Sequence, residues 1–363
     1  MRAAVVAAVT SLALVVPTGA SAAPRPVDGW PTTTPARAGF HPTRLDRLAS
    51  EARARRSTCL AVVRDGRLVE DWSWHGRRTT PRQVFSVTKS VVSALVGIAV
   101  RDGDLAVDDP VSRYVRSWRG TDSATVTVRD ILSNTSGRYW SMESDYDLLV
   151  HARNRTAYAV GLTQQHPRGT TWAYNNAAIQ VLDRVLRVAT GMPTDRLAAT
   201  RLFTPLGMTH TTMTRDQSGR STNAFFGVQS TCLDLARFAR LYLGQGAVDG
   251  HRILSRAWVR QSVGRSSSTL NAAYGYLWWV NRYGVLRGAT DAVDASEQPV
   301  ETHVGQLVPD ASPSLFSALG LGGQVAMVDP GSRTIVVRLG ASGTGDRYGL
   351  RDAARVVTWA ASR

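Results

Sequence analysis

The chain contains very little lysine. It carries forty-two arginines but only one lysine, Lys89, among its 363 residues. Arginine supplies positive charge but does not lose its proton in a protein, whereas a lysine can do so when it is buried or lies near positive potential. Lys89 follows Ser86 by three residues, about one helical turn. We therefore expect Lys89 to supply an amine that can deprotonate; the alternative is a compositional bias with one surviving lysine.

Other missing patterns exclude several classes of protein. The chain has no Cys-x-x-Cys, no His-Glu-x-x-His and no cluster of histidine with cysteine, so we expect no metal and no cofactor. It has no Gly-x-Ser-x-Gly, which argues against an α/β-hydrolase. The arginines never form a run longer than two, so we expect no nucleic-acid partner. The net charge of +15 favours association with anionic polymers of a cell envelope, the alternative being a solvated surface of no specific use.

Long apolar runs are also scarce, and the longest one lies at the N-terminus. Residues 3–16 are apolar or small, follow Arg2, and precede three small residues that end at Ala22. Fourteen residues are too few to cross a bilayer, which takes about 20, but they are typical of a signal peptide. We expect a signal peptide at 1–22 cleaved near Ala22, and a secreted protein without a membrane span; an uncleaved anchor is the alternative. An exposed leader at 23–40 and a single domain at 41–363 would follow.

Cysteine is limited to Cys59 and Cys232. In an oxidising compartment the two could form a disulfide. Because a core of this size needs no covalent link and a free cysteine behaves as a small hydrophobic residue, we favour two buried thiols, with a disulfide as the alternative.

Hydrophobic patterns place strands at both ends of the chain and helices between them. The pattern predicts hairpins at 59–74 and 325–339 and a strand at 274–281. The segment 288–332 is acidic and has no lysine or arginine; we expect an exposed loop there, with an acidic flap as the alternative. Helices are expected at 41–56, 86–101, 126–134, 176–190, 194–203, 233–243 and 347–361. This order predicts an α+β fold, with one antiparallel sheet assembled from both chain ends, flanked by helices, and a helical region inserted at about 104–270.

Ser86 and Lys89 form a candidate catalytic pair. The helix predicted at 86–101 is apolar on nearly every side, which is typical of a buried central helix. Both its positive N-terminal potential and its apolar surroundings lower the pKa of a lysine there. A neutral Lys89 amine could then take the proton of the Ser86 hydroxyl. The alternative, an exposed serine and lysine at a helix start, fits poorly with so apolar a helix.

Three motifs in order make the chain resemble the penicillin-recognising serine hydrolases, which include class C β-lactamases, D,D-peptidases, and esterases and amidases such as 6-aminohexanoate-dimer hydrolase. The motifs are Phe85-Ser86-Val87-Thr88-Lys89-Ser90, Tyr174-Asn175-Asn176, and Gly320-Leu321-Gly322-Gly323-Gln324. The resemblance covers roughly residues 40–360 and implies a β-lactamase/transpeptidase-like fold.

The resemblance also implies a role for the residues of the first two motifs. Ser86 would be the nucleophile, Lys89 its base, and Tyr174 the group that passes the proton to the leaving group. Asn176 would orient the substrate or the lysine; a helix N-cap is the alternative for this residue.

In the third motif, the backbone N–H of Gln324 would complete an oxyanion hole with that of Ser86. Gly322 and Gly323 would let the substrate backbone approach closely. Leu321 and these two glycines stand where β-lactamases and D,D-peptidases carry Lys-Thr-Gly, so the cation that binds a substrate carboxylate is missing there.

These observations together predict a secreted serine hydrolase. We expect it to cleave an ester or amide bond of a small molecule or peptide through an acyl-enzyme on Ser86. The alternatives are a D,D-peptidase or β-lactamase acting on cell-wall peptides or β-lactams, and a non-catalytic binding module on the same fold.

Overall fold

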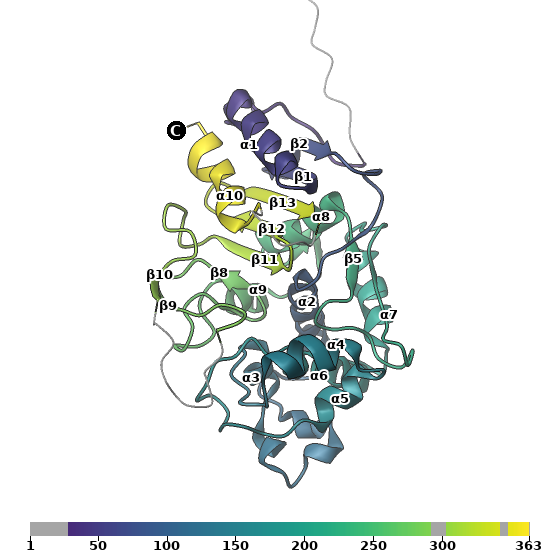
Figure 1. Ribbon diagram of the computed structural model, residues 1–363. Helices are drawn as coiled ribbons and strands as arrows, with labels where there is room; N and C mark the ends of the chain where they lie inside the picture. Colours follow the sequence, from purple (N-terminus) through teal and green to yellow (C-terminus); the bar gives the residue numbers. More distant parts are fainter. Residues whose placement is uncertain (1–27, 292–302, 342–347, 363) are drawn as a thin grey trace, which may run out of the picture.

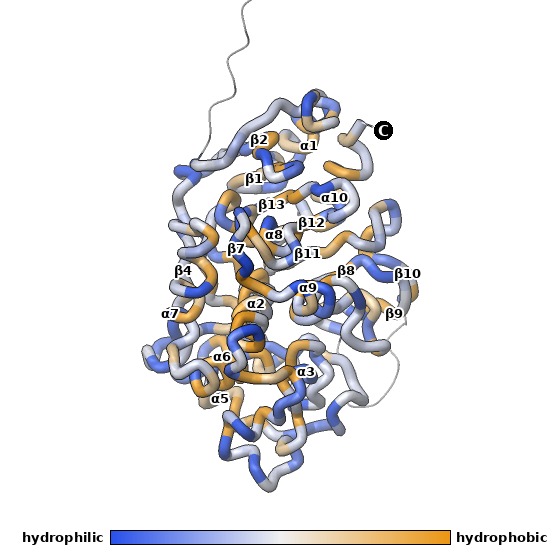
Figure 2. Tube along the Cα trace, turned by 180° about the vertical axis from the view of Figure 1, so that it is seen from behind, coloured by the Kyte–Doolittle hydropathy of each residue, from blue (hydrophilic) through white to orange (hydrophobic). Residues whose placement is uncertain are grey.

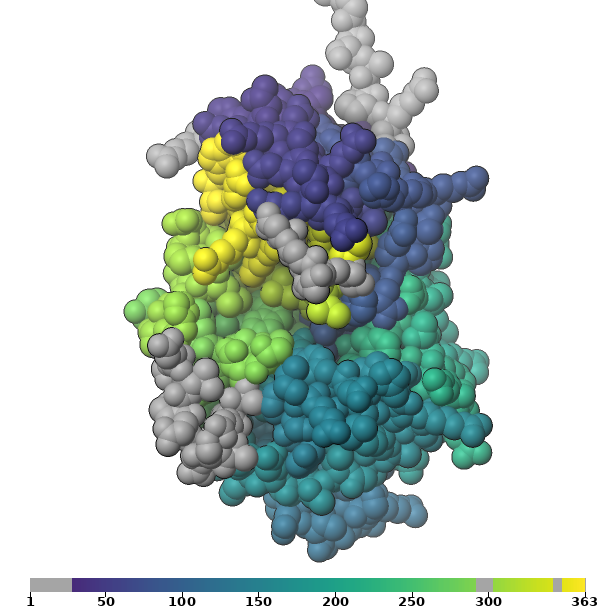
Figure 3. Space-filling view, viewed as in Figure 1, coloured from purple at the N-terminus to yellow at the C-terminus, as the bar shows by residue number. Residues whose placement is uncertain are grey.

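The computed structural model describes residues 28–291, 303–341 and 348–362. The signal peptide expected at 1–22 lies outside these ranges. Figure 1 shows a sheet with helices on both of its faces, and a helical region at one end of the molecule. Figure 3 shows the helical region, in teal, in contact with the sheet region, in yellow and green. Among the described residues, no helix has the length and apolar character needed to cross a bilayer.

One six-stranded sheet organises the molecule. Its order is β2-β1-β13-β12-β11-β8, and every neighbouring pair is antiparallel. β1 pairs with β13, so strands from the two ends of the chain lie side by side in the sheet, as the sequence predicts. The strands are β1 (Ser57–Arg64), β2 (Arg67–Ser73), β8 (Trp279–Val280), β11 (Phe316–Gly320), β12 (Gln324–Asp329) and β13 (Thr334–Gly340).

Two hydrophobic layers cover the faces of this sheet. On one face, α1 (Pro42–Ala54) and α10 (Leu350–Arg355), which continues as a π-helical turn at Val356–Ala360, bury the alternate residues of β1, β12 and β13. On the other face lie α2 (Val87–Asp102) and α8 (Cys232–Leu243). Every residue of α2 from Val87 to Ala99 is buried, and Figure 2 shows hydrophobic residues along this helix. The expected central helix is therefore confirmed.

The remaining helices lie mainly in the inserted region. They are α3 (Val128–Leu132), α4 (Leu149–His151), α5 (Arg155–Gly161), α6 (Asn176–Thr190), α7 (Thr194–Ala198) and α9 (Arg256–Val263). Short 3-10 turns lie at Val111–Arg113, Arg116–Trp118 and Asp122–Thr125, and π-helical turns at Ser144–Leu148 and Ala199–Phe203. One small sheet consists of β3 (Arg82–Gln83), β5 (Val228–Ser230) and β4 (Thr212–Met213), in this order. Two further pairs of short strands are β6 (Ala247–Val248) with β7 (His251–Arg252), and β9 (Gly284–Leu286) with β10 (His303–Gly305).

Several local expectations differ from the structure. The strand expected at 274–281 is reduced to β8, because Leu277 has a left-handed backbone (φ 58°) that interrupts an extended run. The acidic segment expected as a loop at 288–332 contains β11 and all of β12, two strands of the main sheet. The leader expected to be exposed buries two aromatic side chains, Trp30 and Phe40, at 3% and 1% exposure.

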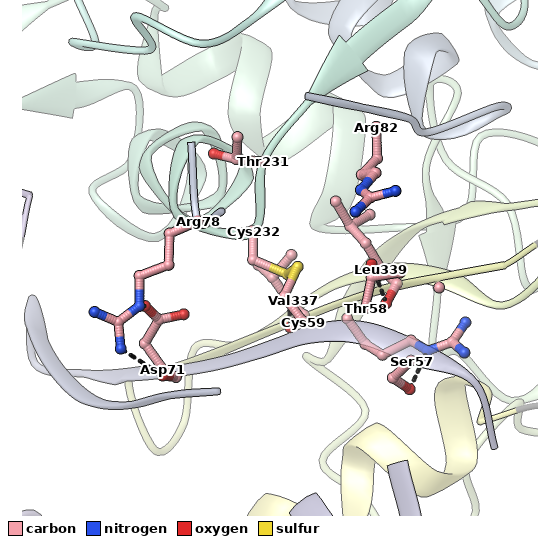
Figure 4. The surroundings of a disulfide bond; sticks show 12 residues. Ser57, Thr58, Cys59, Asp71, Arg78, Arg82, Thr231, Cys232, Val337 and Leu339 are labelled. Atoms are coloured by element: carbon pink, nitrogen blue, oxygen red, sulfur yellow. Dashed lines mark hydrogen bonds and ion pairs between the residues drawn. A yellow bond between two sulfur atoms is a disulfide. The ribbon is translucent and has the colours of Figure 1, made fainter. Parts of the chain in front are cut away.

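The cysteines are the clearest correction. Cys59 of β1 and Cys232, the first residue of α8, form a disulfide rather than two free thiols. Figure 4 shows the bond between the strand and the helix that packs on it. It links residues 173 positions apart, and in a chain-entropy account such a bond stabilises the fold by about 5 kcal/mol.

Candidate active site

Ser86 lies directly before the first residue of α2. Figure 1 shows α2 between the sheet and the helical region. The preceding residue, Phe85, has a φ of 47°, a backbone conformation that bulky residues rarely adopt. Such strain persists only when the surrounding structure enforces it, and it is common at functional sites. The Ser86 side chain is half-buried, which leaves it open to a substrate.

Lys89 lies one turn further along α2, and its side chain turns back toward Ser86. Its Nζ donates to the Ser86 hydroxyl oxygen at 2.8 Å and to the Phe225 carbonyl oxygen at 3.1 Å. The side chain is 1% exposed. Burial lowers the pKa of Lys89 to about 7, against the opposing effect of the Asp145 carboxylate. Near neutral pH a large fraction of this amine is therefore unprotonated and can accept a proton.

Tyr174 forms the third side of the site. Lys89 Nζ lies 4.6 Å from the centroid of its ring. Burial raises the pKa of the Tyr174 hydroxyl, and a hydrogen bond with Ser86 acts in the opposite direction. The structure thus brings together the three side chains that the first two motifs predict, and Tyr174 keeps its proton until a stronger base withdraws it.

The two asparagines that follow Tyr174 have different environments. Asn175, not Asn176, is the N-cap of α6, and its Oδ1 accepts from the backbone N–H of Ala178 at 2.6 Å. The capping alternative considered for Asn176 is therefore wrong. Asn176 is 3% exposed, and its Oδ1 has no hydrogen-bond partner among the described residues. An unpaired buried acceptor is costly, and it is available to a donor that arrives with a substrate.

Asp145 is a member of the site that the motifs do not reveal. It lies in the π-helical turn Ser144–Leu148 and is fully buried. Its carboxylate accepts from the backbone N–H groups of Asn176 and Ala177, at the start of α6. Burial raises the pKa of Asp145 to about 7, while these hydrogen bonds and the charge of Lys89 oppose the rise. The carboxylate therefore holds the Tyr174–Asn176 segment in place and acts electrostatically on the lysine.

The third motif approaches the nucleophile through the end of β11. A Cβ atom added to Gly320 would lie only 2.3 Å from the Val84 carbonyl oxygen, so this strand end is packed against the backbone that leads into Ser86. β8 pairs with β11 only at Phe316 and Ser317. Beyond Ser317, the edge of β11 up to Gly320 therefore lacks a partner in β8.

The turn after β11 serves mainly to hold the sheet together. The side chain of Gln324 is 1% exposed; its Nε2 donates to the carbonyls of Leu321 and Gly340, and its Oε1 accepts from the Gly340 N–H. The carbonyls of Gly322 and Gly323 accept from the buried Arg338 guanidinium. The structure places Gln324 at the first position of β12, opposite Gly320, and Gly323 against the Tyr348 carbonyl.

Aromatic side chains form a wall beside Tyr174. Trp279 stacks on the Tyr174 ring at 5.7 Å between centroids, and Tyr274 packs edge-on at 6.0 Å. Trp278, in contrast, is fully buried in the core. The Tyr146 hydroxyl donates to the Ala289 carbonyl, and this side chain remains 39% exposed. The walls of the site are thus largely aromatic.

A serine at the start of a buried helix, bonded to a buried lysine amine and lying beside a tyrosine, defines a serine hydrolase site. Residues 45–358 match the family model described as Beta-lactamase, and the chain belongs to this family.

Individual relatives agree with this assignment. The chain is 30% identical over 284 residues to Penicillin-binding protein 4 of Amycolatopsis lactamdurans, covering 65% of this chain and 73% of that protein. It is 24% identical over 325 residues to the 6-aminohexanoate-dimer hydrolase of Paenarthrobacter ureafaciens, covering 82% and 76%. The fold matches the crystal structure of D-alanine carboxypeptidase AmpC from Burkholderia cenocepacia with a TM-score of 0.60 at 18% identity, covering 87% of this chain and 96% of that one.

Proposed function

We propose that this protein cleaves an ester or amide bond of a small molecule through an acyl-enzyme on Ser86, with Lys89 as the base. The observation that carries the proposal is the 2.8 Å contact between Lys89 Nζ and Ser86 Oγ, made by an amine whose pKa burial lowers to about 7. An exposed lysine with its ordinary pKa would remain protonated and could not act as a base at neutral pH.

The proposed reaction has two halves. The neutral Lys89 amine takes the Ser86 proton as Oγ attacks the carbonyl carbon, and a tetrahedral intermediate forms. A proton then passes through the Tyr174 hydroxyl to the leaving alcohol or amine, the carbonyl re-forms, and the acyl group stays on Ser86. In the second half, water gives up a proton to the same groups, attacks the ester carbonyl, and releases the acid and the free serine.

The developing oxyanion requires two donors near Ser86. The Ser86 backbone N–H is one. For the other, the close approach of Gly320 to Val84 favours the end of β11, at Gly320–Leu321, over the position at Gln324 that the motif suggests. Each such donor contributes about 3–4 kcal/mol to transition-state stabilisation.

An uncharged substrate fits this site better than a β-lactam or a peptide carboxylate. The edge of β11 beside the nucleophile reads Ser317-Ala318-Leu319-Gly320 and the following turn Leu321-Gly322-Gly323, and neither segment contains a lysine or arginine. The guanidinium of Arg338 contacts this turn, but it is buried and donates to the carbonyls of the two glycines. The aromatic wall of Trp279 and Tyr146 supports an apolar or aromatic acyl or alcohol group. D,D-peptidase or β-lactamase activity is the second candidate, favoured only by the likeness to penicillin-binding proteins.

Export belongs to the same proposal. The N-terminal apolar run with a small-residue cleavage site is typical of secreted proteins, and a disulfide is typical of an oxidising compartment. The site would then act on molecules outside the cytoplasm, where the net charge of +15 also favours contact with anionic envelope polymers.

The decisive test is hydrolysis of p-nitrophenyl acetate by the mature protein beside Ser86→Ala and Lys89→Arg. Lys89→Arg keeps the positive charge but cannot deprotonate. We expect each variant to lose at least about a thousandfold in kcat/KM, and mass spectrometry of a slowly hydrolysed ester to find the acyl group on Ser86.

The wild type should also be assayed against a panel of esters, short amides and a chromogenic cephalosporin. If it cleaves none of them, the proposal fails and the alternative of a non-catalytic binding module remains. An unaffected Lys89→Arg would remove the lysine base from the mechanism.

A further inference from the structure

A second cavity lies in the helical region, away from Ser86. Its volume is about 750 Å³, within the range typical of ligand sites. None of the residues discussed above as part of the active site lines it. Its walls come from the 3-10 turn Arg116–Trp118, from α5 and α6, and from the turn at 215–222. Figure 1 shows α5 and α6 together in this part of the molecule.

The cavity is lined by five arginines. They are Arg116, Arg184, Arg187, Arg215 and Arg220. Three separate elements supply them, and no run of arginines in the sequence exceeds two. It is therefore the fold, and not the local sequence, that brings these charges together. Arg184 and Arg187 lie three residues apart and therefore share one face of α6. With a rise of 1.5 Å per residue, they lie about 12 and 16 Å along the helix axis from Asn176.

Most of these guanidinium groups lack a protein partner. Arg215 forms an ion pair with Asp195 at 2.9 Å, and Arg187 acts electrostatically on Asp183. The side chains of Arg116, Arg184 and Arg220 make no hydrogen bond or ion pair with any described residue. All three side chains are exposed. Each of these guanidinium groups has five N–H donors, which are thus free to contact a ligand.

The one acid in the lining does not neutralise the cavity. Asp183 is 2% exposed, and its two carboxylate oxygens accept from Thr156 at 2.9 Å and Thr194 at 2.8 Å. Its lone pairs are therefore largely engaged within the protein. Asn154 and Ser221, which also line the cavity, add neutral polar groups beside the arginines.

We propose that this cavity binds a small anion that carries two or three linked phosphate groups. Arginine forks match the oxygens of phosphate in a bidentate geometry, and charge-assisted hydrogen bonds of this type are stronger than neutral ones. A single phosphate would engage only some of the arginines, because three separate elements supply them. A chain of phosphates can reach α6 and the 215–222 turn at once.

The test is calorimetric titration of the mature protein with inorganic tripolyphosphate at physiological ionic strength. We expect one saturable site per chain, weaker binding of pyrophosphate, and still weaker binding of orthophosphate. The double variant Arg184→Gln/Arg187→Gln should bind tripolyphosphate at least tenfold more weakly. Arg220→Gln, which alters the 215–222 turn instead of α6, should weaken binding as well and serves as a second, independent variant.

The matched control is Arg53→Gln/Arg256→Gln. These exposed arginines of α1 and α9 lie outside the cavity. The control therefore removes as many positive charges as the cavity variant does, but at other places. The control should bind as the wild type does.

Equal weakening in both double variants would show that only the net charge matters and would overturn the proposal. The absence of saturation at millimolar tripolyphosphate would overturn it as well. Citrate binding as tightly as tripolyphosphate would overturn the assignment to phosphate. Unchanged ester hydrolysis by the cavity variants would show that they are folded.

Discussion

Lys89 Nζ lies 4.6 Å from the centroid of the Tyr174 ring, so the base and the proton-passing tyrosine of the proposed mechanism are in direct contact. Both groups are buried, and burial acts on them in opposite directions. It lowers the pKa of the lysine to about 7 and raises that of the tyrosine. At neutral pH the pair therefore consists of an amine that can accept a proton and a hydroxyl that holds one.

The first prediction concerns the pH dependence of hydrolysis. Because only the neutral amine accepts the serine proton, kcat/KM for a p-nitrophenyl ester should rise with pH and level off above the Lys89 pKa of about 7. Below that pH the ammonium form predominates and the rate should fall about tenfold per pH unit. A profile that stays flat between pH 5.5 and 8, after subtraction of the rate of Ser86→Ala, would contradict this role of Lys89.

The second prediction concerns Asp145. Its charge opposes the lowering of the Lys89 pKa, so Asp145→Asn should lower that pKa further and move the acidic limb of the pH profile to lower pH. The plateau rate should fall by less than about tenfold, because Asp145 transfers no proton in the mechanism.

The control for this change is Asp147→Asn, which removes an exposed carboxylate two residues away that pairs with His151. Asp147→Asn should leave the acidic limb of the pH profile unchanged. A purely structural role of Asp145 would lower the plateau without moving the limb.

The third prediction concerns the contact of β11 with the nucleophile. In Gly320→Ala, the new methyl group would meet the Val84 carbonyl oxygen at 2.3 Å, and the backbone leading to Ser86 must shift. Small displacements of reacting groups can lower rates by about a hundredfold, and we expect a loss of this order in kcat/KM. Gly161→Ala, at a position where a Cβ atom meets nothing within 4 Å, should retain wild-type activity.

The fourth prediction concerns the disulfide. The double variant Cys59→Ala/Cys232→Ala should lose about 2–5 kcal/mol of unfolding free energy, measured by denaturant titration. Dithiothreitol should destabilise the wild type by a similar amount and leave the double variant unaffected. A wild type whose unfolding midpoint does not respond to the reductant would contradict the bond.

The parts of the site that the sequence could predict are those encoded locally. Ser86 and Lys89 are three residues apart on one helix, so their spacing alone relates them to chemistry. Tyr174 precedes a recognisable helix start, but its role is predicted only by the resemblance to a known family. Asp145 comes from an irregular segment about 30 residues before α6. Its carboxylate reaches the site only through the tertiary fold, and no spacing rule points to it.

The errors in the fold also have physical causes. The aromatic run at 274–281 has the composition of a strand, but its side chains pack around Tyr174 and its backbone turns at Leu277. The strand Phe316–Gly320 is short and follows a polar segment, so its burial depends on β12 and β8 beside it. The disulfide joins residues 173 apart, and its geometry depends on how α8 packs on β1.

The bond between Cys59 and Cys232 also makes the catalytic centre part of a closed covalent ring. Ser86, Lys89, Asp145 and Tyr174 all lie between the two cysteines in the sequence. A protease that cuts once in an exposed turn of this stretch would open the ring without releasing either fragment. The cleaved chain would run as one species in a non-reducing gel and as two after reduction. The elements that hold nucleophile, base and tyrosine would stay tethered after such a cut.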